Sequence, residues 1–140
     1  MDAAHNESPD ANHAGIEKAI AACVEDFYGK ARKDALLGPV FNNAVADWDS
    51  HLRTVANFWS HVLLKTERYK GFPFPVHTQL PIRPEHFPRW LELFEESANK
   101  FLPPAYAEAA IARSQHMARS FMSGIFPFTD ENGKAARRPG

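Results

Sequence analysis

The chain has 140 residues, a length typical of one domain with a hydrophobic core of its own. Its 16 basic and 17 acidic residues nearly cancel, and no basic stripe or acidic block argues for nucleic acid binding or a charged tail. The 12% aromatic content predicts a core built from flat rings.

The N-terminal third contains one predicted helix. Residues 1–14 are polar and are expected to form a flexible tail. They lack the apolar run of a secretory signal. Asn12 is the expected cap of the helix, and Gly38-Pro39 marks the turn that follows it, ahead of a short segment with Val40 and Phe41. Apolar residues at helical spacing define its inward face: Ile16, Ile20, Cys23, Val24, Phe27 and Tyr28.

The second predicted helix begins near Asp47 and carries a broad apolar stripe. His51 shares this stripe, so its side chain is predicted to face inward among large apolar neighbours. The other members are Trp48, Leu52, Val55, Phe58, Trp59, Val62 and Leu63.

A long irregular connection spans residues 66–84. Five helix-breaking residues exclude a long helix there: Gly71, Pro73, Pro75, Pro81 and Pro84. His77 lies between two of these prolines, in a stretch with room for about one helical turn. The connection also contains several apolar residues, which argues against disorder. Long connections inside compact domains are commonly functional, so we expect function here.

Two further helices are predicted in the C-terminal half. The third begins at about Pro84 and carries Trp90 on its apolar face. Pro103-Pro104 ends it and opens the fourth. Residues 128–140 turn polar and are expected to form a flexible tail, which leaves one domain at residues 15–127. The chain is predicted to be all-α, and a four-helix bundle is the simplest form of that architecture.

Cysteine usage and hydropathy indicate the compartment. Cys23 is the single cysteine, which excludes an intramolecular disulfide and favours a reducing environment. No stretch approaches the ~18 apolar residues of a membrane-spanning helix. We therefore expect a cytoplasmic monomer that binds neither membranes nor nucleic acid.

Common catalytic and metal-binding motifs are missing from the sequence. There is no cysteine pair, no His-x-x-x-His on a predicted helix and no glycine-rich phosphate loop. What remains is Tyr28, His51 and Trp90, which lie on the inward faces of three different helices. Each has an apolar body and one polar atom that needs a partner when buried. Taken alone, each is more often an ordinary core residue, but together they indicate a pocket that contains something polar.

Six short motifs, each present once, follow one another along the chain. They are FYGK at 27–30, LGPVFNN at 37–43, WDSH at 48–51, NFW at 57–59, HTQLP at 77–81 and RWLELFEES at 89–97. In this order and spacing, over roughly residues 15 to 126, the sequence resembles the group III truncated haemoglobins. The resemblance implies a truncated globin fold, a two-over-two helical sandwich around haem b.

The resemblance also implies roles for individual residues. His77 would be the proximal ligand to the haem iron. Tyr28, His51 and Trp90 would lie on the distal face, where oxygen, nitric oxide and similar ligands bind. The side chains expected to contact the haem are Phe41, His51, Val55, Phe58, Trp59, His77, Leu80, Ile82 and Trp90.

Several other polar residues have more than one interpretation. Arg68, Lys70 and Arg83 are candidates for pairing with the haem propionates, and the sequence does not choose among them. His61 and His86 are expected at the surface.

The function predicted from the distal donors Tyr28 and Trp90 is tight oxygen binding. Each distal donor would contribute about 1–3 kcal/mol to a ligand with partial negative charge. Slow release makes a poor carrier, so oxygen and nitric oxide redox chemistry, or peroxide handling, is expected with a separate reductase. Two alternatives remain open: a gas-sensing or scavenging haem protein without turnover, and a helical interaction module without a cofactor.

Overall fold

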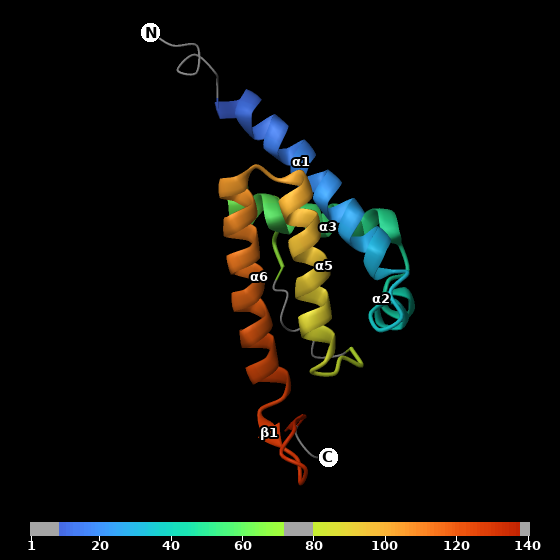
Figure 1. Cartoon of the computed structure of the whole chain (residues 1–140). Coiled ribbons are helices and arrows are strands. Elements are labelled where there is room, and N and C mark those ends of the chain that lie inside the picture. The colour runs from blue at the N-terminus through green and yellow to red at the C-terminus, as the bar shows by residue number, and fades with distance from the viewer. Residues whose placement is uncertain (1–8, 72–79, 138–140) are drawn as a thin grey trace.

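The structure is a computed structural model that describes residues 9–71 and 80–137 (Figure 1). Within these residues the chain forms five helices and one short hairpin, so the predicted all-α architecture is confirmed. The helices are α1 (Pro9–Ala31), α2 (Gly38–Ala44), α3 (Trp48–Leu64), α5 (His86–Phe101) and α6 (Pro104–Ile125). The hairpin strands are β1 (Phe128–Thr129) and β2 (Ala135–Ala136).

The helices form two layers. α5 and α6 lie side by side and run in opposite directions, joined by a short turn at the top of Figure 1. α1 packs against both α5 and α3, and α3 also contacts α6. This pairing agrees with the predicted two-over-two sandwich. None of the described helices combines the length and apolar content needed to cross a membrane.

The helix ends follow from local chemistry. The Asp47 carboxylate caps α3 by accepting a hydrogen bond from the Ser50 N–H at 3.2 Å, which confirms the predicted start. α1 begins at Pro9, so Asn12 lies inside the helix and its predicted role as a cap is wrong. Proline suits the first turn of a helix because its φ is preset and no intrahelical donor is lost there.

The buried residues of the described chain form two apolar clusters. The main cluster joins α1, α3 and α5, and includes Phe27, Tyr28, Trp59 and Phe94. The second cluster lies where α5 and α6 meet the segment after residue 80. Its buried members are Ile82, Phe87, Ala118, Phe121, Ile125 and Phe126.

The C-terminal region contains structure where a loose tail was expected. β1 and β2 pair antiparallel, with Phe128 opposite Ala136. Arg137 then donates two hydrogen bonds from one guanidinium nitrogen, to the Leu80 carbonyl at 2.7 Å and the Ile82 carbonyl at 2.9 Å. Its guanidinium also lies 5.3 Å from the centre of the Phe126 ring. These contacts attach the hairpin to the domain, while the division into a domain and two tails stays a prediction.

Replacing Arg137 should therefore destabilise the fold. Arg137→Ala removes two hydrogen bonds to backbone carbonyls and one cation–π contact, so we expect the free energy of unfolding to fall by about 1–2 kcal/mol. Urea unfolding followed by circular dichroism measures this difference. Lys134→Ala, an exposed change on the same hairpin, is the control. Equal stability of the two variants would contradict the anchoring role.

Candidate functional site

A tyrosine and a histidine from different helices meet inside the protein. Tyr28 of α1 is buried, with 8% of its surface exposed, and His51 of α3 is half-buried. The Tyr28 hydroxyl and His51 Nε2 are 3.2 Å apart, and the two rings pack edge to face. Burial raises the pKa of the Tyr28 hydroxyl above its ordinary value, which is itself high enough for the hydroxyl to keep its proton at neutral pH. A protonated hydroxyl can donate one hydrogen bond and accept others.

Trp90 reaches this pair through Phe27. The Phe27 ring lies 4.9 Å from the Tyr28 ring and 6.2 Å from Trp90, centre to centre, with an edge-to-face geometry in both cases. Trp90 itself stacks on Phe94, with ring centres 5.8 Å apart. Two of the three predicted distal residues, Tyr28 and Trp90, thus pack on the Phe27 ring, and the third, His51, makes a direct polar contact with Tyr28.

Phe41 of α2 closes another side of the site. Its ring packs edge to face on Tyr28 at 5.3 Å and on Phe27 at 6.4 Å. α2 follows a tight turn at Gly38, where a Cβ atom would lie 2.7 Å from the Arg32 carbonyl oxygen. Glycine is therefore required at this turn, and the turn brings Phe41 back over α1.

Trp48 belongs to the site but was assigned only to the apolar stripe of its helix. Its ring centre lies 5.5 Å from Tyr28 and 5.6 Å from His51, and the Arg32 guanidinium lies 4.2 Å from it. The spacing contained the signal, because residues three apart on a helix share a face and Trp48 precedes His51 by three. Phe27 was likewise treated as a core residue.

The remaining predicted haem contacts fall into two groups. Val55, Phe58 and Trp59 belong to the main cluster, where Trp59 stacks on Phe94 with ring centres 4.8 Å apart. Leu80 and Ile82 belong to the second cluster. His77 lies outside the described residues. The haem-binding roles of all these residues stay predictions.

The border between the two clusters suits a flat apolar group. On α2, Phe41 packs with the main cluster and its neighbour Val40 with the second; on α5 the same holds for Trp90 and Leu91. Met117 of α6 touches both clusters. All five side chains are only half-buried. A domain of this size usually has one continuous core, and a haem along this border would complete the burial of both sides.

Arg68 has protein partners of its own. Its guanidinium forms an ion pair with Glu17 of α1 and donates to Asn57 at 3.1 Å and to Ser60 at 2.9 Å, both on α3. Arg83 pairs with Glu85 at 3.0 Å. Both cations therefore already have carboxylate partners within the protein.

His86 is buried, so the prediction that it lies at the surface is wrong. Only 6% of its surface is exposed, and its Nδ1 accepts a hydrogen bond from the Arg83 N–H at 2.7 Å. The ring thus satisfies a donor just before the first turn of α5, a role that histidine spacing does not reveal. His61 is exposed, as predicted.

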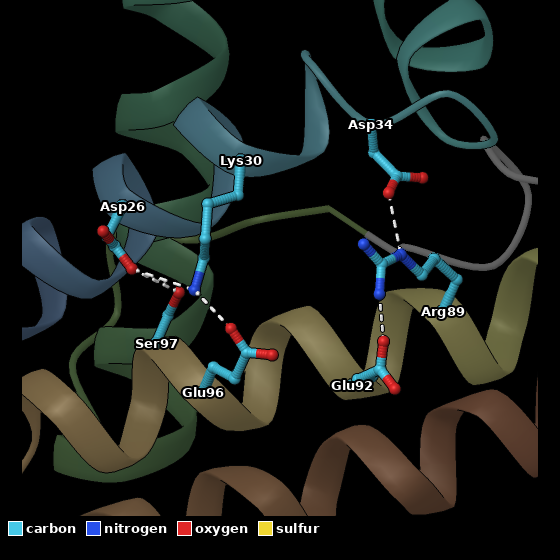
Figure 2. A network of polar contacts seen from close by, with 7 residues as sticks. All are labelled: Asp26, Lys30, Asp34, Arg89, Glu92, Glu96 and Ser97. Carbon is cyan, nitrogen blue, oxygen red and sulfur yellow. Dashed lines mark hydrogen bonds and ion pairs between the residues drawn. The ribbon is translucent and has the colours of Figure 1, made fainter.

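Two polar clamps hold α5 beside α1 and the turn that follows α1 (Figure 2). In the first, Arg89 donates to the Asp34 carboxylate at 2.7 Å and also pairs with Glu92. Burial alone would raise the pKa of Asp34, but hydrogen bonds from Leu37, Arg89 and Leu36 bring it below its ordinary value. Asp34 and Arg89 together form the first clamp.

The second clamp lies farther along α5. The Ser97 hydroxyl donates to the Asp26 carboxylate at 2.8 Å, and Lys30 bridges Asp26 at 3.2 Å and Glu96 at 3.4 Å (Figure 2). Burial again opposes ionisation, while the hydrogen bonds from Ser97 and Lys30 lower the pKa of Asp26 below its ordinary value. Both clamps therefore depend on ionised carboxylates.

Comparison with known proteins finds relatives in Campylobacter jejuni. The chain is 38% identical over 117 residues to a group 3 truncated haemoglobin of Campylobacter jejuni subsp. jejuni, and the match covers 80% of this chain and 92% of that protein. It is also similar to the crystal structure of a group III truncated haemoglobin from Campylobacter jejuni. That likeness has a TM-score of 0.76 and 36% sequence identity, and covers 82% of this chain and 94% of the other. No family model matches the chain.

The clamps predict a loss of stability in acid. The folded-state pKa values of Asp26 and Asp34 lie below that of an unfolded aspartate, which is ~3.9. Their stabilising contribution is therefore complete above pH ~4 and is lost as the pH falls through the folded-state values. Urea unfolding between pH ~7 and ~3 should show this fall, and the double variant Asp26→Asn/Asp34→Asn should flatten it. Glu25→Gln, an exposed change on α1, should leave the pH profile as in the wild type.

Proposed function

The chain belongs to the group III truncated haemoglobins, and on this basis we propose that it holds haem b through His77, binds oxygen tightly and catalyses oxygen and nitric oxide redox chemistry. Membership of this family makes the chain a globin that binds haem and small gaseous ligands. The alternative of a helical module without a cofactor is therefore set aside. The tight binding, the reaction and the residue roles are our proposal.

The border between the two clusters would hold the haem. Phe41 and Val55 would pack on it from the main cluster, and Leu80 and Ile82 from the second. His77 would supply a neutral imidazole as a ligand to the iron. When bound, haem supplies an iron that takes up a gaseous ligand and gives it an electron.

The contact between Tyr28 and His51 is the observation that carries the proposal. At 3.2 Å, either atom can be the donor, depending on the histidine tautomer. If His51 carries its proton on Nε2, it donates to the Tyr28 oxygen and leaves the Tyr28 O–H directed at another acceptor. In that tautomer the Tyr28 hydroxyl would act as the donor to a ligand that takes on negative charge.

Trp90 would be the second distal donor. Its indole N–H can donate but not accept, so it favours the same kind of ligand as the Tyr28 hydroxyl. Packing against Phe27 and Phe94 holds the ring in place, which reduces the entropy lost when it donates. Two fixed donors slow the release of oxygen, and slow release suits chemistry better than transport.

Nitric oxide dioxygenation matches these properties. Oxygen and nitric oxide combine to nitrate with the uptake of one electron, which has to be replaced before the next turnover. We propose that a separate reductase supplies it, and that the protein works as a cytoplasmic monomer.

The ligand role of His77 can be tested by absorption spectroscopy. We expect the purified or haem-reconstituted wild type to show a Soret band with a five-coordinate ferrous form in the absence of oxygen. His77→Ala should lose haem or change this spectrum, while the exposed change His61→Ala should not. A wild type without stoichiometric haem would overturn the proposal, and an unaltered spectrum in His77→Ala would overturn the ligand assignment.

The donor roles can be tested by oxygen dissociation measured in stopped flow. Tyr28→Phe and Trp90→Phe should each raise the rate about 10-fold, which corresponds to the loss of a charge-assisted hydrogen bond of ~1.4 kcal/mol. Tyr106→Phe is the matched control, because Tyr106 lies near the start of α6, at the far end of α5 from Trp90. Rates equal to those of this control would exclude Tyr28 and Trp90 as donors.

A further inference from the structure

We infer that the first clamp, Asp34 with Arg89, is a positioning device that sets where Phe41 and Trp90 lie relative to the Tyr28–His51 pair. The inference rests on the proposed function, because it concerns the same ligand site. Neither residue would touch the ligand or the haem. Each would act through a neighbour on its own segment.

Asp34 controls the entry into α2. Its carboxylate accepts hydrogen bonds from the Leu36 N–H at 3.1 Å and the Leu37 N–H at 3.0 Å, and its side chain is only 9% exposed. Leu37 is buried and directly precedes Gly38, the first residue of α2. One carboxylate thus fixes the turn that leads to Phe41, which lies one turn of helix farther on.

Arg89 controls the start of α5. Its Nε donates to Asp34 at 2.7 Å, and Trp90 is the next residue of the same helix. Consecutive residues of an α-helix project about 100° apart, since 3.6 residues make one turn. Asp34 lies in the turn between α1 and α2. Because it holds the Arg89 side chain, it fixes the rotation of α5 about its axis at the turn of helix that carries Trp90.

The second clamp makes this arrangement rigid. Arg89 and Ser97 are eight residues apart on α5, which is about 12 Å along the helix axis. Trp90 and Phe94 lie between them, and Phe94 is the ring on which Trp90 stacks. With α5 held at both points, the segment between them has little freedom to slide or rotate against α1.

The exposure of Arg89 limits how much its ion pair adds to the stability that Asp34 contributes through its other hydrogen bonds. The Arg89 side chain is 40% exposed, and ion pairs with an exposed partner contribute little to global stability. The geometry of the pair is nevertheless specific, because the carboxylate that accepts from Arg89 also accepts from two backbone N–H groups. A substitution can therefore disturb the site while the fold persists.

Asp34→Asn in the haem-loaded protein isolates the pair. The amide oxygen can still accept from the backbone of residues 36 and 37, but the charge that holds Arg89 is gone. We expect the infrared C–O band of bound carbon monoxide to shift or split, and the oxygen dissociation rate to rise about fivefold, the loss expected for one displaced hydrogen bond. Glu92→Gln, which changes the exposed partner of Arg89, should leave both readouts as in the wild type.

Arg89→Lys keeps a positive charge and provides a second variant if Asp34→Asn does not fold. It should give an intermediate C–O band and rate, because an ammonium can still reach a carboxylate without the planar fork of arginine. Haem content is measured first. Wild type without haem would overturn both the proposed function and this inference, whereas haem-loaded Asp34→Asn and Arg89→Lys that match wild type in band and rate would overturn this inference alone.

Discussion

A buried hydroxyl must keep a hydrogen-bond partner, and in this protein the Tyr28 hydroxyl has His51. This requirement links α1 to α3 at one point, and the rings around it follow from that link. Phe41 of α2 and Trp48 of α3 both pack on Tyr28, and Phe27 packs on Tyr28 and on Phe94 of α5. The site is thus an aromatic shell around a single polar contact, and its chemistry depends on which of the two partners donates the hydrogen bond, as set by the tautomer of His51.

Helical periodicity predicts most of the fold, because long apolar stripes leave little choice of structure. The start of α3 was predictable since Asp47 is a good cap, and the break before α6 since two prolines stand there. The start of α1 was placed too late, because a proline at the first helical turn is as good a beginning as a polar cap. The C-terminal hairpin was missed because strands of two residues carry no period.

In the candidate site, too, some residues could be predicted from the sequence and others could not. Tyr28, His51 and Trp90 could be predicted because inward-facing polar atoms stand out on apolar stripes. His86 and Asp34 could not, since each satisfies backbone N–H groups, and no side-chain pattern marks such a contact in advance. Arg89 finds its partner 55 residues away, a distance at which sequence spacing carries no information. The motif order of the truncated globins, rather than any single residue, identified the family.

The contacts of Arg137 affect the order in which the protein folds during synthesis. Its two carbonyl partners precede it by 57 and 55 residues, so on the ribosome they emerge long before it does. Residues 80–82 thus stay unfastened until a further 55 to 57 residues have been added, and closing so long a loop carries an entropic cost. Helices α1 and α3 can dock early, but the face of the protein nearest residues 80–82 is completed last.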